Sequence, residues 1–276
     1  MNYTDLLYQA ILAAVAGGKE ILTVYDTDFS VEYKEDDSPL TLADKKASQK
    51  ISEMLEHLRI PVLSEEGEHT AFETRRHWKH LWIVDPLDGT KEFVKRNGEF
   101  TVNIALVEEG IPKVGVIYSP VLKDIYFAAL GLGAFKINKH DFMRIEESVH
   151  TLTLDNLVAM AGKLPLAQDH KTYRVVASRS HMSSETYAYI EQLKKQHPEV
   201  EIVSTGSSIK MCWVAEGVAN EYPRFGPTME WDTAAGQAIL QQAGCELIDY
   251  DTKEPMQYNR AELLNHWFIA RRKGLL

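Results

Sequence analysis

The sequence is poor in cysteine, which argues against a zinc centre built on thiolates. Only Cys212 and Cys245 occur among the 276 residues, and neither belongs to a Cys-x-x-Cys pair. Both stand among apolar residues, so we expect two buried free thiols, as in a protein of a reducing compartment.

The chain also lacks the positive charge that general nucleic-acid binding requires. It has 30 Lys and Arg against 40 Asp and Glu, a formal net charge of −10. A protein that binds nucleic-acid polymers presents a basic surface, so we expect no such partner. A phosphorylated small molecule stays compatible with this charge if metal ions and local basic residues offset the repulsion.

Segments that direct a protein to a membrane are missing as well. The N-terminus lacks the basic and apolar regions of a signal peptide. No apolar run reaches the roughly 18–20 residues that would span a bilayer. We therefore expect a cytoplasmic protein without a transmembrane segment. The sequence leaves open peripheral association with the inner face of a membrane, and it does not indicate the oligomeric state.

Residues 81–93 are the most informative stretch that is present. Four apolar residues predict a short buried strand, and Asp85-Pro86-Leu87-Asp88-Gly89-Thr90 follows as a rigid corner. Carboxylate oxygens suit hard divalent cations such as Mg²⁺, and the N–H groups of Gly89 and Thr90 suit an anion. Taken alone, the motif fits equally well an acidic turn after a strand.

Two further carboxylates precede this corner in the sequence. Glu65 follows a short strand at residues 61–63, so two adjacent strands could bring Glu65 and Asp85 to one end of a sheet. Asp44 stands three residues after Thr41, at the start of a helix. This spacing also fits a capping box, in which Asp44 would have a purely structural role.

The pattern of elements divides the chain into two parts. Residues 4–26 and 41–58 predict helices with one apolar face, and residues 100–137 predict antiparallel strands, which together indicate an α+β domain over residues 1–155. Residues 138–170 are polar and irregular in pattern, and we place the boundary within them. Strands and helices alternate afterwards, which indicates an α/β domain over residues 156–276.

Three segments, in order and spanning most of the chain, resemble the inositol-monophosphatase-like superfamily of metal-dependent, lithium-sensitive sugar and nucleotide phosphatases. They are Ser64-Glu65-Glu66, Asp85-Pro86-Leu87-Asp88-Gly89-Thr90 and Trp231-Asp232-Thr233-Ala234-Ala235-Gly236. Three more look like its bacterial 3′(2′),5′-bisphosphate nucleotidase branch: Lys91-Glu92-Phe93, Gly206-Ser207-Ser208-Ile209-Lys210 and Tyr222-Pro223-Arg224-Phe225-Gly226-Pro227-Thr228. Inositol phosphatases typically have Asn where Glu92 stands.

The resemblance implies a layered α/β/α/β/α sandwich of the sugar phosphatase type. It also implies Mg²⁺-dependent hydrolysis of the 3′-phosphate of adenosine 3′,5′-bisphosphate to AMP and phosphate, as part of sulfur assimilation. Carried over by position, the ligands of two or three Mg²⁺ ions would be Glu65, Asp85, the carbonyl group of Leu87, Asp88 and Asp232. The catalytic residues would be Asp44 and Thr90, which orient and deprotonate the attacking water, together with Glu65.

The same resemblance implies a set of substrate contacts. They would be Glu65, Leu87, Asp88, Gly89, Thr90, His181, Ser207, Lys210, Arg224 and Asp232. Lys210 follows Ser207 by one helical turn, so both could face one pocket, and Arg224 suits bidentate contact with a phosphate.

Plainer interpretations of these substrate residues stay open. Lys210 could be a solvated surface lysine, and Arg224 could pair with an acid. His181 could be an ordinary loop histidine, and Asp232 could simply cap a helix.

Two other functions stay open at this point. One is an inositol monophosphatase or another sugar-phosphate phosphatase of the same superfamily. The other is a protein of the same fold that binds an anion through metal ions without catalysis. The presence of both Asp44 and Thr90 argues against the second, because a binding protein has no need to activate water.

Overall fold

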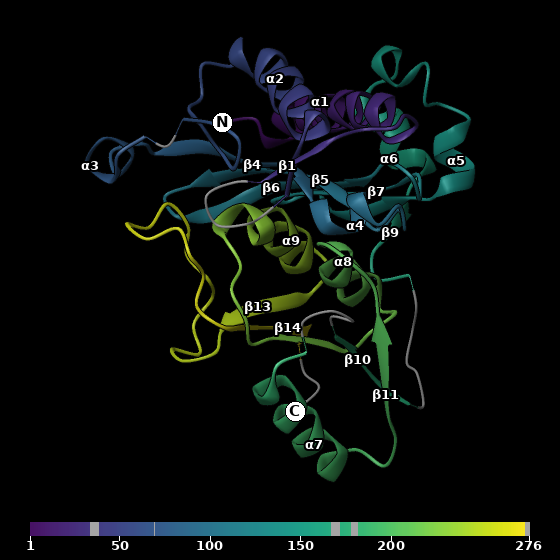
Figure 1. Ribbon diagram of the computed structural model, residues 1–276, viewed down its shortest axis with the longest axis vertical. Helices are drawn as coiled ribbons and strands as arrows, with labels where there is room; N and C mark the ends of the chain where they lie inside the picture. The colour runs from purple at the N-terminus through teal and green to yellow at the C-terminus, as the bar shows by residue number, and fades with distance from the viewer. Residues whose placement is uncertain (34–38, 69, 167–171, 178–181, 274–276) are drawn as a thin grey trace.

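Two helices from the N-terminal region cover one face of a large sheet (Figure 1). The computed structural model describes residues 1–33, 39–68, 70–166, 172–177 and 182–273. Helix α1 (Tyr3–Tyr25) and helix α2 (Leu42–Glu56) pack against each other. Gly17 permits this approach, because a Cβ atom there would lie 2.8 Å from Ile51. The helices predicted over 4–26 and 41–58 are therefore confirmed.

The large sheet has seven strands in the order β3-β4-β5-β6-β7-β8-β9. Strands β3 and β4 are parallel and every later pair is antiparallel. The strands are β3 (Val62–Ser64), β4 (His80–Asp88), β5 (Thr101–Glu108), β6 (Ile111–Ser119), β7 (Asp124–Ala129), β8 (Gly133–Ile137) and β9 (Gly162–Lys163). Both faces of the sheet are buried, since successive side chains of β5 enter two different cores.

Two helices lie between the large sheet and a second sheet (Figure 1). They are α8 (Ile209–Glu216) and α9 (Glu230–Gln242). Helix α9 crosses β6 at Gly115, where a Cβ atom would lie 2.4 Å from the carbonyl oxygen of Ala235. Only glycine allows this backbone contact. The tight crossing fixes the helix that carries Asp232 to the sheet that carries Asp85.

The second sheet has five strands in the order β11-β10-β12-β14-β13, and helix α7 (Ser184–Gln196) covers its outer face (Figure 1). Its strands are β10 (Tyr173–Ala177), β11 (Val200–Ser204), β12 (Glu221–Arg224), β13 (Cys245–Asp249) and β14 (Phe268–Arg272). The order of layers is thus helix, sheet, helix, sheet, helix, and the predicted α/β/α/β/α sandwich is confirmed.

Shorter elements complete the chain. They are β1 (Val31–Tyr33), β2 (Pro39–Thr41), α3 (Phe72–Arg75), α4 (Thr90–Val94), α5 (Lys139–Met143), a 3₁₀ turn (Val149–Thr151) and α6 (Leu154–Met160). Strand β9 follows α6 and still pairs with the first sheet. The division into domains at residues 1–155 and 156–276 stays a prediction.

Helix α1 has the length and apolar composition of a membrane-spanning helix, although no apolar run of that length was expected from the sequence. Its apolar side chains, among them Leu7, Ile11 and Ile21, are buried in the core beside the large sheet. A buried core helix and a membrane span share these properties, and here the packing identifies a core helix. The two cysteines are buried free thiols, as expected.

Candidate active site

The acidic corner lies where β4 leaves its regular pairing with β5. The register shifts between Asp85 and Asp88, and Gly89 follows with φ 95°, which starts α4. The Asp85 carboxylate is buried and accepts a hydrogen bond of 3.0 Å from the N–H of Leu87. Strand β3 lies parallel to β4, and the N–H of Glu65 donates to the carbonyl oxygen of Val84. The prediction that adjacent strands deliver Glu65 and Asp85 to one sheet end is confirmed.

A fourth carboxylate reaches this corner from the other half of the chain. Asp232 lies in the first turn of α9, and its Oδ2 accepts a hydrogen bond of 2.8 Å from the N–H of Met229. Carboxylate oxygens of Asp85, Asp88 and Asp232 lie within 4.8 Å of one another. Asp232 therefore takes part in the capping box of α9 and also faces the acidic corner, while its role as a metal ligand stays a prediction.

Burial and the repulsion of neighbouring carboxylates raise the pKa of Asp85 and of Asp232. Burial is the main cause for Asp85, whose pKa lies well above its usual value, and the charges of Glu65 and Asp88 add to it. Burial and the charge of Asp88 likewise raise the pKa of Asp232 to about 8. Such a cluster of oxygen donors fits a hard divalent cation, which would relieve the repulsion.

Asp44 and Thr90 form a hydrogen-bonded pair beside the corner. Asp44 is buried, and its Oδ2 accepts bonds from the N–H and the hydroxyl group of Thr41 at 2.7 and 2.6 Å. Its Oδ1 faces the hydroxyl group of Thr90 at 3.3 Å. Burial raises the pKa of Asp44 despite the bonds from Thr41. The predicted capping box is present, yet one carboxylate oxygen still points towards Thr90.

The turn before α8 fixes Asp88 from the second half of the chain. Oδ2 of Asp88 accepts three hydrogen bonds of 2.6 Å, from the hydroxyl groups of Ser207 and Ser208 and the N–H of Ser208. The Ser208 hydroxyl also lies 2.9 Å from the carbonyl oxygen of Asp232. Ser207 has φ 55°, a left-handed conformation uncommon for serine. Ser208 was not predicted as a site residue, although two hydroxyl side chains directly before a helix were a usable signal in the sequence.

A pocket of about 660 Å³ opens at this corner, and its lining includes the basic residues Lys91, Lys95, Lys210 and Arg224. Lys210 is only 7% exposed; its ammonium group lies 3.5 Å from the Thr205 carbonyl oxygen and 5.7 Å from the centre of the Tyr222 ring. Burial lowers the pKa of Lys210 to about 8. Lys210 is therefore not a solvated surface lysine.

Arg224 lines the same pocket and has spare hydrogen-bonding capacity. It donates to the carbonyl oxygen of Pro227 at 2.9 Å, and its buried Nε has no hydrogen-bond partner among the described residues. Within the part of the chain that the structure describes, neither Lys210 nor Arg224 forms an ion pair with a carboxylate. Both cations are thus free for an anion in the pocket.

Nearly all of the expected site residues lie together. Those that line the pocket are Glu65, Asp85, Leu87, Asp88, Gly89, Thr90, Ser207, Lys210, Arg224 and Asp232. Asp44 joins them through Thr90. His181 lies outside the described residues.

Five alternating layers with an acidic corner between the two sheets are the architecture of the layered sugar phosphatases. The chain belongs to the inositol monophosphatase family, whose sequence model matches residues 2–273. The family is metal-dependent, and the acidic corner could bind metal. The expected superfamily membership is confirmed.

Several relatives match over nearly the whole chain. The 3′(2′),5′-bisphosphate nucleotidase CysQ of Salmonella typhimurium is 46% identical over 95% of this chain and 98% of its own. CysQ of Escherichia coli K12 is 43% identical with the same coverage. The crystal structure of CysQ from Bacteroides thetaiotaomicron, 48% identical, matches with a TM-score of 0.89 over 99% of this chain and 98% of that one.

Proposed function

We propose that the protein is a 3′(2′),5′-bisphosphate nucleotidase that hydrolyses the 3′-phosphate of adenosine 3′,5′-bisphosphate, which yields AMP and phosphate. The observation that carries the proposal is one pocket lined both by the acidic corner and by Lys210 and Arg224, neither of which forms an ion pair among the described residues. A substrate with two phosphate groups suits such a pocket. The full-length relatives named CysQ support the same assignment.

The proposal includes two or three Mg²⁺ ions, held by Glu65, Asp85, Asp88, Asp232 and the carbonyl group of Leu87. Oxygen donors of this kind are the ligands that Mg²⁺ prefers. When bound, Mg²⁺ supplies a water molecule of lowered pKa and neutralises charge on the phosphoryl oxygens. Sensitivity to lithium would follow from this kind of metal site.

The chain's own residues orient the reactants in this scheme. The Thr90 hydroxyl group lies between Oδ1 of Asp44 and the carbonyl oxygen of Leu87, at 3.3 and 3.4 Å. We assign to Thr90 and Asp44 the uptake of the proton from the attacking water, with Glu65 as a second carboxylate beside it. The N–H groups of Gly89 and Thr90 would contact the scissile phosphate. Ser207, Lys210 and Arg224 would hold the nucleotide and its other phosphate, and His181 keeps that role as a prediction.

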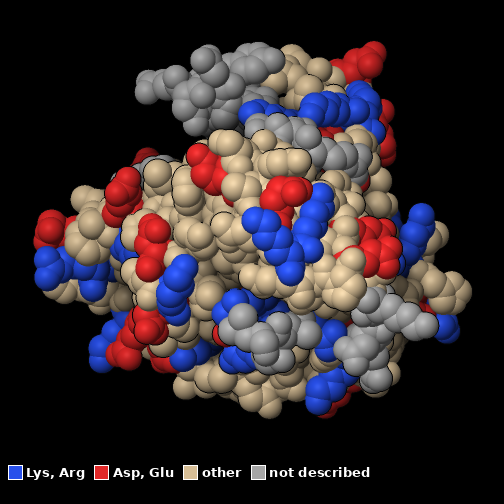
Figure 2. All heavy atoms as spheres, turned by 90° about the horizontal axis from the view of Figure 1, so that it is seen from below, with Lys and Arg blue, Asp and Glu red and all other residues tan. Residues whose placement is uncertain are grey.

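The surface agrees with a small substrate. Figure 2 shows Lys and Arg side chains interspersed with Asp and Glu on the face drawn there, so the described residues form no continuous basic track on that face. Nucleic-acid polymers bind along such tracks. We place the reaction in the cytoplasm, in the recycling of the adenosine bisphosphate during sulfur assimilation. Peripheral membrane association is not included in the proposal.

Phosphate release measured with Mg²⁺ tests the proposal. We expect adenosine 3′,5′-bisphosphate to be hydrolysed in preference to inositol 1-phosphate and to 3′-AMP. Lys210→Met should raise KM for the bisphosphate about 10–100-fold, since a charge-assisted hydrogen bond contributes about 1.5–3 kcal/mol. The KM for 3′-AMP, which has no second phosphate group, should stay almost unchanged. Lys163→Met, at an exposed residue of β9, is the control. A preference for inositol 1-phosphate would instead support the inositol phosphatase alternative.

A further inference from the structure

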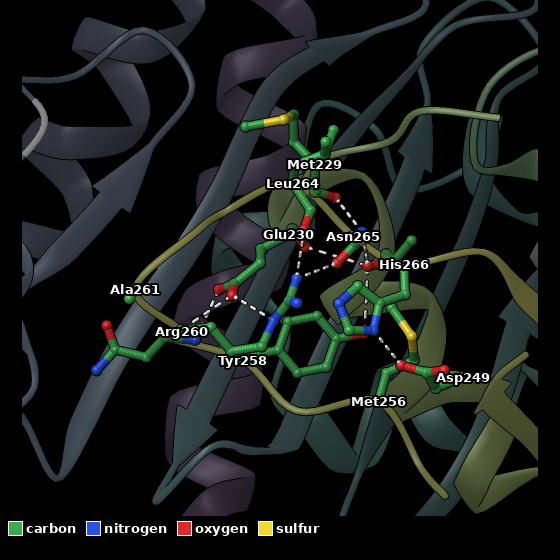
Figure 3. Close-up of polar contacts among 12 residues, drawn as sticks. Met229, Glu230, Asp249, Met256, Tyr258, Arg260, Ala261, Leu264, Asn265 and His266 are labelled. Carbon is green, nitrogen blue, oxygen red and sulfur yellow. Dashed lines mark hydrogen bonds and ion pairs between the residues drawn. The ribbon is translucent and has the colours of Figure 1, made fainter. Parts of the chain in front are cut away.

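The long connection between β13 and β14 runs beside the start of α9, where Leu264 pairs with Met229 (Figure 3). Its residues 256–265, hereafter the clamp loop, contain little regular structure but make many specific hydrogen bonds. Leu264 of this loop lines the active-site pocket. None of the residues assigned above to metal or substrate belongs to the clamp loop.

The clamp loop binds the first residue of α9 through a buried charge. Glu230 is fully buried, and its carboxylate accepts a bond of 2.6 Å from the N–H of Asn259. It also accepts bonds from the N–H and the Nε of Arg260, at 3.0 and 3.2 Å (Figure 3). The N–H of Glu230 donates to the carbonyl oxygen of Leu263. Glu230 precedes Asp232 by two residues, so these bonds fix the turn of helix that carries Asp232.

Asn265 of the loop also contacts this turn of α9. The side-chain amide of Asn265 donates to the carbonyl oxygen of Met229 at 2.7 Å (Figure 3). It also donates to the hydroxyl group of Thr233 at 3.0 Å. Its backbone N–H donates to the carbonyl oxygen of Thr228 at 2.8 Å. Residues on both sides of Asp232 are therefore tied to the clamp loop.

The same loop also binds the segment that follows Glu65. Arg75, at the end of α3, is only 3% exposed and donates to Oδ1 of Asn259 at 2.9 Å and to the carbonyl oxygen of Ala261 at 3.0 Å. The side-chain amide of Asn259 in turn donates a hydrogen bond of 2.8 Å to the carbonyl oxygen of Arg75. Arg75 lies in the connection from β3 to β4, which begins at Glu65. One loop thus bridges the start of α9, which carries Asp232, and the connection between β3 and β4, which begins at Glu65.

We propose that the clamp loop sets the position of Asp232 relative to Glu65 and so determines how tightly the acidic corner binds a divalent cation. Arg75, Asn259, Arg260 and Asn265 are positioning residues in this account, because they act through the backbone that carries the two carboxylates. The inference rests on the proposed metal site. Outer partners of metal ligands commonly change metal affinity about 10–100-fold when they are replaced.

Calorimetric titration of the metal-free protein with Mg²⁺ tests this role without any turnover. Arg75→Lys keeps the charge but replaces the two planar donor nitrogens by a single ammonium group, which does not reproduce the geometry of both bonds, and we expect Mg²⁺ affinity to fall at least about tenfold. Asn259→Gly removes the side-chain bonds while it permits the residue's φ of 63°, and a similar loss is expected. Lys253→Gly, at an exposed residue with φ 61°, is the matched control and should bind Mg²⁺ as the wild type does.

Steady-state kinetics separates positioning from a general loss of structure. At saturating Mg²⁺ both clamp variants should recover kcat and KM to within about twofold, because the catalytic residues themselves are intact. Unchanged Mg²⁺ affinity together with a lower unfolding temperature would show that the loop only stabilises the fold, and this would overturn the inference. Should Arg75→Lys not fold, Asn259→Gly decides the question. A wild-type protein that binds no Mg²⁺ would refute the metal site itself.

Discussion

Asp85→Asn is expected to lower turnover of adenosine 3′,5′-bisphosphate about 1,000-fold or more, because loss of a metal ligand removes several kcal/mol of charge stabilisation from the transition state.

The same substitution should stabilise the metal-free protein against unfolding. Asparagine can still accept the bond from the Leu87 N–H, but it adds no charge beside Asp88 and Asp232. In metal-free buffer at pH 8 we expect its unfolding temperature to rise by a few degrees, since 1 kcal/mol corresponds to about 2–4 °C for a protein of this size.

The pH dependence of stability gives a second readout for Asp85. The pKa values of Asp85 and Asp232 are raised in the folded protein, to about 8 for Asp232, whereas both carboxyls titrate near 4 in an unfolded chain. The folded state then holds its protons more tightly, so the metal-free wild type should lose stability as pH rises from about 4 to about 8. Mg²⁺ should restore stability most strongly at the upper end of this range. In Asp85→Asn, the free energy of unfolding of the metal-free protein should fall less steeply with pH than in the wild type.

A control aspartate should respond in the opposite way. Asp124 pairs with Lys136 at 3.1 Å and accepts a bond from the N–H of Lys139. Asp124→Asn should cost up to about 1 kcal/mol of stability and leave turnover unchanged. Full activity in Asp85→Asn, or a metal-free Asp85→Asn protein less stable than the wild type, would contradict the account of the acidic corner.

Asp44→Asn is expected to lower kcat about 100–10,000-fold, the range in which general acid–base groups contribute. Asparagine can occupy the space of Asp44 but cannot take up a proton through Thr90. Mg²⁺ affinity and KM should change little, because Asp44 does not line the pocket. Rapid-quench measurement of the chemical step beside equilibrium binding of AMP would separate the two effects. Undiminished hydrolysis would contradict the assignment of water activation to Asp44 and Thr90.

The protein contains its own control for the capping role of Asp44. Helix α6 begins with the same type of capping box, in which the side chain of Asn156 accepts a bond of 3.0 Å from the N–H of Thr153. Asparagine can therefore fill the third helical position of a capping box, the position that Asp44 occupies in α2. Asp44→Asn should for this reason cost little stability. Thr153→Ala, which removes the cap of α6, should lower stability by about 1 kcal/mol without an effect on kcat. A wild-type protein that binds AMP but releases no phosphate from adenosine 3′,5′-bisphosphate would favour the non-catalytic alternative.

The sequence predicted best those features that have a periodic or local signal. Helices α1 and α2 have long apolar faces, and the strands up to β8 alternate with clear turn residues. Glu65 and Asp85 could be placed together because parallel neighbouring strands end at the same sheet edge. The approach of Asp232 to that edge had no such local signal. It followed only from the resemblance of its motif to a family.

Features formed between irregular segments could not be predicted in this way. The bonds between Arg75 and Asn259 join residues 184 positions apart, in two loops without periodicity. Ser208 gave a turn signal that did not indicate which carboxylate it would contact. Within residues 138–170, α5 and α6 span five and seven residues, too few to show a helical period. The Thr153-x-x-Asn156 pattern was the one usable sign of α6.

A crystal structure of the protein soaked with Mn²⁺ and AMP tests the central claim most directly, because the anomalous signal of Mn²⁺ locates the ions independently of the protein. We predict anomalous peaks among Asp85, Asp88 and Asp232, with Glu65 in contact, and the AMP phosphate beside Lys210 and Arg224. Absence of a peak at this corner in crystals that contain Mn²⁺ and AMP, with the four carboxylates turned away from one another, would contradict the account.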